Sequence, residues 1–132
     1  MKRFEIEHIG ITVTEPVEMA HWYQDIVGFN IKFSGQDEEK GVVFLTDSVG
    51  KVMLEFGKLP NISALSDIKD HHLQLHIALE SDNPDSDSKY LIEKGATFIE
   101  KYPMTMPGDY LIVLNDRWNN CIQLVKRKNK LM

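Results

Sequence analysis

Hydrophobic and polar positions alternate in two sets of short segments along this chain. The first set covers residues 4–13, 29–33, 41–46 and 51–56, and the second covers residues 72–79, 96–102, 110–114 and 120–125. Alternation with a period of two is typical of β-strands that bury one face. The sequence therefore predicts eight strands, four in each half of the chain.

One helix is predicted in each half, directly after the first strand. In the first half Pro16 opens the helix and Gly28 ends it, because proline suits the first turn and glycine suits a left-handed end. Between them apolar residues recur at helical spacing: Met19, Trp22, Tyr23 and Ile26. In the second half residues 84–94 form a helix that Gly95 ends. Each half therefore has the order βαβββ.

The two halves match as repeats at about residues 4–58 and 71–127, joined by a polar connector that is predicted to be a loop. A shift of 68 positions brings Gly28 within one position of Gly95 (28 + 68 = 96). Two repeats are too few for a solenoid, which needs roughly three or more, and either module alone buries little apolar surface. We expect a single domain, residues 1–132, of the α+β class. Two βαβββ modules in tandem would then enclose a concave site between curved mixed sheets.

Two histidines stand at the same distance from a polar partner. His8 precedes Glu55 by 47 positions (55 − 8), and His76 precedes Gln123 by 47 positions (123 − 76). Each histidine opens the first strand of its half, and each partner lies in the last strand. Imidazole nitrogens with a carboxylate oxygen suit Zn, Ni, Co, Mn or Fe(II), whereas an all-oxygen set would suit Mg or Ca. The repeated distance therefore indicates a metal site.

Strand alternation predicts which way these four side chains face. Ile9, Ile11 and Val13 are expected to pack beneath the helix, so His8 faces the other way. The same argument puts Glu55, His76 and Gln123 on sheet faces that the helices do not cover. The four residues can converge if two curved sheets close around those faces.

The composition excludes several classes of partner. A formal net charge of −5 without a basic block argues against nucleic acid and against anionic membranes, which need clustered Lys and Arg. Cys121 is the single cysteine, so no disulfide within the chain is expected, and it is interpreted as a small buried filler. No signal peptide or membrane-length apolar run is predicted, so a cytoplasmic protein is expected.

Three runs in the chain carry a family resemblance: HIGITV at 8–13, WYQDIVGF at 22–29 and DRWNNCIQL at 116–124. They resemble the vicinal oxygen chelate superfamily, which includes glyoxalase I, methylmalonyl-CoA epimerase, extradiol dioxygenases, fosfomycin-resistance enzymes and bleomycin-binding proteins. The family pattern in the last run is Asp-Pro-x-Gly-Asn-x-hydrophobic-Glu-hydrophobic. This chain has Arg117 for Pro, Asn119 for Gly and Gln123 for Glu. Asn is the next best residue after Gly for a left-handed turn, so that change should spare the fold, whereas Gln123 bears on the chemistry.

The resemblance implies a site for one divalent transition metal, with His8, Glu55 and His76 as ligands and Gln123 in the fourth position. A neutral amide is a poorer donor than a carboxylate. The site is therefore either a four-ligand set with two open positions or a two-His-one-carboxylate set with three. In glyoxalase I the residue at position 123 is a Glu that serves as the base, so standard glyoxalase I activity is not expected. Glu55 is the remaining catalytic candidate on the matched positions.

Two classes of function follow from the resemblance. The first is a metal-dependent lyase or isomerase of the glyoxalase-like kind, acting on a small carbonyl compound through a metal-stabilised enolate, with an Fe(II) extradiol-type dioxygenase as a sub-variant. The second is a metal-free protein that binds a drug or another small molecule, as bleomycin-resistance proteins do. A homodimer is expected, and the site forms either within one chain or across two.

Other polar residues are given structural interpretations. His21 is expected on the helix surface, and His71 and His72 where the connector enters the strand, because none has a partner at a matching spacing. The acidic run at residues 37–39 is expected to be a solvated hairpin tip.

Overall fold

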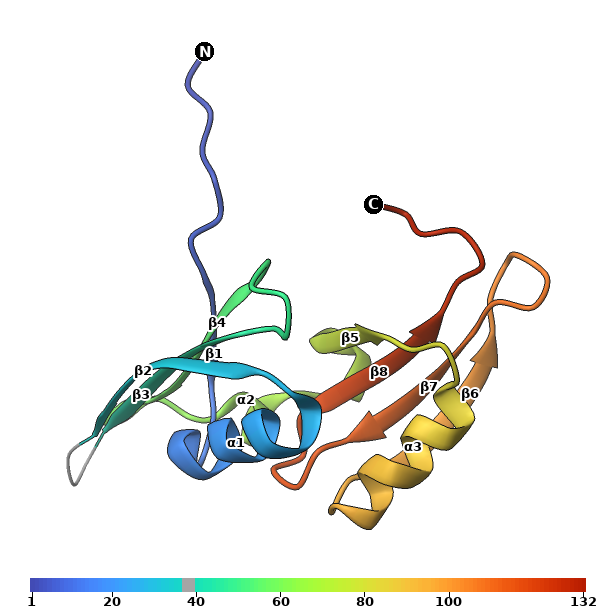
Figure 1. Cartoon of the computed structure of the whole chain (residues 1–132). Coiled ribbons are helices and arrows are strands. Elements are labelled where there is room, and N and C mark those ends of the chain that lie inside the picture. The colour runs from blue at the N-terminus through green and yellow to red at the C-terminus, as the bar shows by residue number, and fades with distance from the viewer. Residues whose placement is uncertain (37–39) are drawn as a thin grey trace. The chain divides into compact units, whose positions relative to one another are not determined.

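The computed structural model describes residues 1–36 and 40–132, so the expected hairpin tip at 37–39 lies outside the described residues. The chain divides into two compact units, residues 1–68 and 69–132, and each contains one four-stranded mixed sheet (Figure 1). This confirms the α+β class and the two βαβββ modules in tandem. The expectation that both units form one domain stays a prediction.

The first unit begins with β1 (Ile9–Thr12), the α-helix α1 (Pro16–Trp22) and a π-helical turn, η1 (Tyr23–Val27). Three strands follow, β2 (Asn30–Gln36), β3 (Gly41–Thr46) and β4 (Met53–Lys58), and a short helix, α2 (Leu65–Ile68), closes the unit. The strand order is β1-β4-β3-β2. β1 runs parallel to β4, and the other neighbours are antiparallel.

The second unit has the same plan. A 3₁₀ turn, η2 (His72–Gln74), leads into β5 (His76–Glu80) and α3 (Pro84–Glu93). The strands β6 (Thr97–Pro103), β7 (Tyr110–Asn115) and β8 (Cys121–Lys126) complete a sheet in the order β5-β8-β7-β6. β5 runs parallel to β8, as β1 does to β4.

The registers of the two sheets match at the positions that the sequence singles out. Gly10 on β1 lies opposite Glu55 on β4, and Ala78 on β5 lies opposite Gln123 on β8. The outer antiparallel pairs also share an irregularity, between Ile31 and Phe33 in one sheet and between Phe98 and Glu100 in the other. The modules are therefore structural repeats down to the register of their strands.

The core of the first unit lies between its sheet and the helical segment after β1. Tyr23 is fully buried, and its ring contacts the ring of Phe56 at a centroid distance of 5.4 Å. Gly28 ends the helical segment with φ of 88°, a left-handed conformation that glycine adopts without steric cost. Since Phe56 faces the helices, Glu55 beside it faces away from them.

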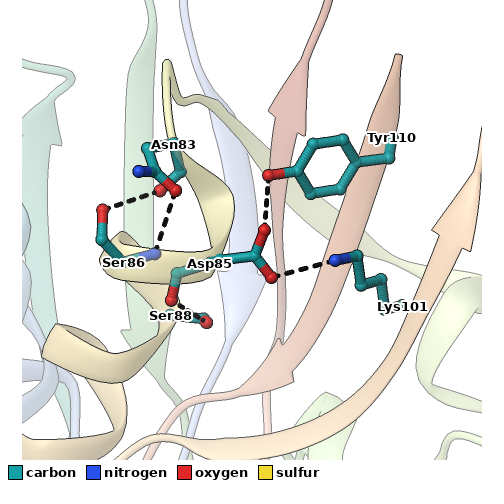
Figure 2. A network of polar contacts seen from close by, with 6 residues as sticks. All are labelled: Asn83, Asp85, Ser86, Ser88, Lys101 and Tyr110. Carbon is teal, nitrogen blue, oxygen red and sulfur yellow. Dashed lines mark hydrogen bonds and ion pairs between the residues drawn. The ribbon is translucent and has the colours of Figure 1, made fainter. Parts of the chain in front are cut away.

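In the second unit a polar network attaches α3 to the sheet (Figure 2). Asp85 in the first turn of α3 accepts hydrogen bonds from the Tyr110 hydroxyl at 2.7 Å and from Lys101 Nζ at 3.0 Å. Asn83 caps the helix by accepting from the Ser86 backbone N–H at 3.2 Å. Because Lys101 and Tyr110 face α3, the residues that alternate with them face the opposite side of the sheet.

Two strands are predicted to start four or five residues too early. β1 begins at Ile9 rather than at residue 4, because its partner β4 begins at Met53 and the backbone N–H groups of Lys51 and Val52 before it already donate to the Asp47 carboxylate. Phe4 and Ile6 are consequently exposed, and Ile9 is 44% exposed rather than buried beneath the helix. β5 begins at His76 rather than at residue 72.

The 3₁₀ turn before β5 has a local cause. The Gln74 side chain accepts from the backbone N–H groups of Asp70 and His71, and the His71 ring accepts from the Leu73 N–H. These side-chain bonds satisfy backbone groups that a strand would have used, so the segment turns instead of extending. The connector is likewise not all loop, since it contains α2.

None of the helices in the described part of the chain has the length and apolar character that a bilayer-spanning segment requires.

Candidate metal centre

His8 and Glu55 lie side by side on the sheet of the first unit. His8 comes directly before β1, and its Nε2 atom lies 3.7 Å from Oε2 of Glu55 on β4. The His8 ring also meets the Phe44 ring edge-on, with centroids 5.1 Å apart. Phe44 is the β3 residue opposite Glu55, so the three side chains share the face away from the helices. Both polar side chains stay about one-third exposed, at 35% and 31%.

The absence of a side chain at Gly10 leaves room for the Glu55 carboxylate. A Cβ atom at Gly10 would come within 3.3 Å of Glu55 Oε1, and one at Gly57 would come within 3.5 Å of the same oxygen. Any larger residue on the neighbouring strand would crowd this oxygen. Gly10 therefore keeps open the space that the Glu55 carboxylate occupies beside the His8 ring.

Glu7 contacts the other nitrogen of the His8 ring, Nδ1. A carboxylate only accepts, so Nδ1 carries the proton and Nε2 bears the lone pair when the ring is neutral. The hydrogen bond that His8 donates to Glu7 raises the pKa of His8 above its ordinary value of 6.5, and the charge of Glu55 adds to the shift. Metal-binding histidines are typically oriented by a carboxylate or a carbonyl in this way.

The second unit presents the matching pair on its own sheet. The His76 ring donates from Nδ1 to the Leu73 carbonyl oxygen at 3.2 Å, which again leaves the lone pair on Nε2. His76 lies two residues before Ala78, the register partner of Gln123, so both face the same side. Gln123 is buried, with 7% of its surface exposed.

The His8–Glu55 pair of the first unit has donor atoms and a spacing that suit a divalent transition metal. Zinc binds imidazole nitrogen and carboxylate oxygen at about 2.1 Å, so one ion can join two donors that lie up to about 4.2 Å apart. The 3.7 Å between His8 Nε2 and Glu55 Oε2 falls within that limit. Within each unit, the described residues contain no group of three or more His, Cys, Asp or Glu side chains that could hold an ion. Each unit by itself therefore contributes two of the four predicted ligands.

A third polar group on the second sheet was not anticipated from the sequence. His72 Nε2 lies 3.1 Å from Glu100 Oε1, and the Tyr102 hydroxyl donates to the same oxygen. Glu100 lies opposite Val113, and Val113 lies opposite Gln123, so the Glu100 carboxylate shares a sheet face with Gln123. Because β7 lies between β6 and β8, the backbones that carry Glu100 and Gln123 are about 10 Å apart. His72 was interpreted as a strand-entry residue because its partner lies 28 positions away without a repeat of that spacing.

Cys121 is buried at 3% exposure, in agreement with its interpretation as a filler. Burial raises the pKa of its thiol above the usual value, and the charge of Lys69 opposes that shift. His21 lies on an exposed position of α1, as expected.

Comparison with protein-family models identifies the family of this chain. Residues 5–124 match the model of the Glyoxalase/Bleomycin resistance protein/Dioxygenase superfamily. The chain belongs to this superfamily. Members with solved structures have the same fold across nearly their whole length, whereas no curated protein sequence gives a significant match.

Three of these superfamily structures illustrate the likeness. A glyoxalase family protein from Bacillus cereus is 12% identical with a TM-score of 0.75, over 96% of this chain and 95% of that one. TnmS3, an antibiotic binding protein from Streptomyces sp. CB03234, is 18% identical with a TM-score of 0.70, over 97% and 99%. The fosfomycin resistance protein FosX from Listeria monocytogenes is 12% identical with a TM-score of 0.69, over 99% and 97%. At these identities the likeness establishes the fold alone.

Proposed function

We propose that this protein is a metal-dependent enzyme of the glyoxalase-like kind, which carries out lyase or isomerase chemistry on a small carbonyl compound. Its ligands to one divalent transition metal are His8, Glu55, His76 and Gln123. The pair in each unit supplies half of the site, and a homodimer or a single chain brings the halves together.

The orientation of the two histidines is the observation that carries this proposal. In both units Nδ1 donates to an oxygen acceptor, the Glu7 carboxylate in one and the Leu73 carbonyl in the other. In both units the same nitrogen, Nε2, is left with the lone pair that a metal needs. Both histidines are therefore in the tautomer that suits a metal ligand.

A bound transition metal would supply Lewis-acid stabilisation of negative charge on a substrate oxygen. The chain's own residues must then accept and return the proton next to the carbonyl group. The Gln123 amide has no basic site for this step, whereas Glu55 has a carboxylate beside the proposed metal. The His72–Glu100 pair is a second proton acceptor on the face of Gln123, with Tyr102 holding the carboxylate in place.

Exchange of substrate hydrogen for solvent deuterium tests the chemistry without knowledge of the natural substrate. The metal-loaded protein is incubated in D₂O with hydroxyacetone, dihydroxyacetone and glycolaldehyde, and proton NMR follows the signal of the carbon next to the carbonyl. We expect exchange above the buffer rate with at least one compound, and its loss in Glu55→Gln. Metal-loaded protein that exchanges none of the three compounds would contradict the proposal.

The Glu100→Gln variant distinguishes between the two candidate proton acceptors, Glu55 and the His72–Glu100 pair. This substitution leaves all four proposed ligands unchanged, so the metal content should stay at the wild-type level. Loss of exchange in Glu100→Gln assigns the proton transfer to the His72–Glu100 pair, whereas unchanged exchange assigns it to Glu55.

Mixing two inactive variants tests whether the site forms across two chains. His8→Ala and His76→Ala each remove one histidine. In a homodimer with shared sites, a mixed dimer keeps one complete set of ligands. We expect unfolding and refolding of the two variants together to restore about a quarter of the wild-type metal content, because half of the dimers are mixed and each keeps one of two sites. No recovery would assign the site to a single chain.

Small-molecule binding without a metal is the second candidate function. The likeness to an antibiotic binding protein favours it. Tight binding of an antibiotic by metal-free protein, unchanged in His8→Ala, would support this candidate over the enzyme.

A further inference from the structure

An irregularity in β2 decides which face of the first sheet carries Phe33. Strict alternation would put Phe33 on the same face as Ile31 and its buried partner Leu45. The register shifts between Ile31 and Phe33, however, so Phe33 lies opposite Phe44 instead of Val43. A bulge of this kind changes the face to which the following side chains point, and bulges are frequent beside active sites. Phe33 consequently lies on the face of Phe44, away from the helices.

Phe33 thereby joins a row of residues that crosses all four strands. Phe33 lies opposite Phe44, Phe44 opposite Glu55, and Glu55 opposite Gly10. The rings of Phe33 and Phe44 have centroids 6.3 Å apart, and the His8 ring meets Phe44 edge-on at 5.1 Å. Both distances are typical of aromatic contacts. An aromatic surface therefore begins directly beside the proposed metal donors.

The Phe33 ring lies low over the sheet and stays accessible. A Cβ atom at Gly35 would come within 3.2 Å of the ring atom Cε1 and 3.3 Å of Cζ, so the ring covers a position that has no side chain. The Glu55 carboxylate lies in the same way over Gly10. Phe33 remains 57% exposed, and it forgoes the burial that the helix-covered face would have given it. The exposed part of the ring is therefore available to a ligand.

The second unit has an equivalent bulge that presents a carboxylate instead. Its register shift lies between Phe98 and Glu100. Phe33 precedes Glu100 by 67 positions (100 − 33), the distance that also separates the two helix-ending glycines (95 − 28). Glu100 shares a sheet face with Gln123, as Phe33 does with the first pair of proposed ligands. The two repeats therefore use the same bulge to present an apolar ring in one unit and an acidic group in the other.

We propose that Phe33 and Phe44 bind an aromatic ring of the substrate, so that an arylcarbonyl compound is favoured over an aliphatic one with the same reacting end. This inference rests on the proposed function, because it takes the His8–Glu55 pair as the metal end of the site. Neighbouring strands lie about 4.8 Å apart, so the two rings are one and two strands from Glu55. An aryl group bonded to an oxygen-bearing carbon reaches across that distance. A ring that packs edge-on or offset against Phe33 gains more than an aliphatic group of the same area.

Two hydroxamates test this subsite. Benzohydroxamate and acetohydroxamate carry the same metal-chelating group and differ in a phenyl against a methyl group. Calorimetric titration of zinc-loaded protein should show benzohydroxamate binding about tenfold more tightly than acetohydroxamate. Phe33→Ala should reduce this preference to within about twofold at unchanged zinc content. Phe33→Leu, which keeps an apolar side chain without a ring, should retain an intermediate preference.

Phe98→Ala is the matched control. Phe98 is exposed to a similar degree, at 50%, but it precedes the bulge of its unit and lies opposite the buried Leu114, on the helix side of the second sheet. Phe98→Ala should leave the preference for benzohydroxamate at the wild-type level. A preference that survives in Phe33→Ala, or that falls equally in Phe98→Ala, overturns the inference.

The same titrations distinguish a failure of this inference from a failure of the proposed function. If zinc-loaded protein binds acetohydroxamate and benzohydroxamate equally well, the aromatic subsite is refuted while the metal site stands. If the protein retains no zinc, the proposed function fails, and metal-free protein titrated with benzamide still tests the rings. Amide NMR shifts at residues 33–35 and 42–44 that vanish in Phe33→Ala support the subsite, and their absence overturns it.

A second copy of the chain is the competing occupant of this face. Sedimentation of Phe33→Ala tests it. Conversion of a dimer to a monomer, together with an unchanged preference for benzohydroxamate, would make Phe33 a contact between copies and overturn its role in substrate binding.

Discussion

Gly10 on β1 lies opposite Glu55 on β4, and a Cβ atom added at Gly10 would come within 3.3 Å of Glu55 Oε1. The same oxygen would lie 3.5 Å from a Cβ atom at Gly57. The 3.3 Å distance at Gly10 is shorter than an ordinary van der Waals contact, whereas the 3.5 Å distance at Gly57 is within the ordinary range. The space for the Glu55 carboxylate therefore depends on the absence of a side chain at position 10.

Gly10→Ala should weaken metal binding several-fold while leaving the fold intact. The added methyl group displaces the carboxylate by a few tenths of an ångström from the position beside His8. Gly57→Ala is the matched control, because its methyl group makes only an ordinary contact with the same oxygen. Titration with Zn²⁺ in competition with a chelator measures both affinities. Equal affinities in the two variants would show that the space at Gly10 is irrelevant to binding.

Glu7→Gln should lower the metal affinity by about tenfold, because a carboxylate on the second nitrogen orients a metal-binding histidine and makes it a better donor. Glu5→Gln removes the same charge two residues away, from a position that is also exposed. Calorimetric titration with Zn²⁺ compares the two variants. If both lose the same affinity, the effect is one of overall charge, and the specific role of Glu7 is refuted.

Gln123→Glu should make the stability of the protein depend on metal. A carboxylate is a better ligand than an amide, so the affinity should rise. In the metal-free protein, however, a charge at this buried position is costly, and the free energy of unfolding should fall by about 1–3 kcal/mol. Urea unfolding with and without excess Zn²⁺ measures the difference. A variant as stable as the wild type without metal, and no more stabilised with it, would argue against a metal near Gln123.

Asp85 should stabilise the second unit at neutral pH but not in acid. The hydrogen bond from Tyr110, followed by that from Lys101, lowers the pKa of Asp85 below its usual 3.8. The folded state therefore binds protons less readily than the unfolded state. The resulting stability is present above the usual pKa and is lost as the pH falls through the lowered one. Urea unfolding of Asp85→Asn should show a deficit at pH 7 that narrows below about pH 3.

Asp82→Asn, which removes a neighbouring carboxylate outside this network, is the control for Asp85→Asn. At pH 7, Asp82→Asn should lower the free energy of unfolding by less than Asp85→Asn does. A deficit in Asp85→Asn that is the same at both pH values would mean that the network does not depend on the charge of Asp85.

Much of the fold could be predicted because the alternation along each strand is regular. A period of two correctly put Phe56 beneath the helices and Glu55 on the opposite face, and Gly28 and Gly95 correctly marked the helix ends. The start of β1 was wrong because alternation at Phe4 and Ile6 does not reveal where the partner strand begins. A strand needs hydrogen-bonding groups on its neighbour as well as a pattern of its own.

The polar groups that depend on distant contacts could not be predicted. His72 reaches Glu100 only because a 3₁₀ turn replaces the expected start of β5 and a sheet brings β6 within reach. Likewise, nothing in the sequence shows that the Thr46 hydroxyl is buried without a hydrogen-bond partner among the residues that the structure describes. The four proposed ligands were found because a repeat of the whole module repeats their spacing.

The metal content of the purified protein tests the central claim most directly. Inductively coupled plasma mass spectrometry of protein loaded with Zn²⁺ and then passed through a desalting column counts the ions retained per chain. We expect about one ion per chain in the wild type and less than about a tenth in His8→Ala, Glu55→Ala and His76→Ala, with circular dichroism showing that each variant is folded. Gln123→Ala should retain an intermediate amount, since an amide is the weakest of the four donors. A wild-type protein without bound metal, or variants that retain as much as the wild type, would contradict the proposed metal site.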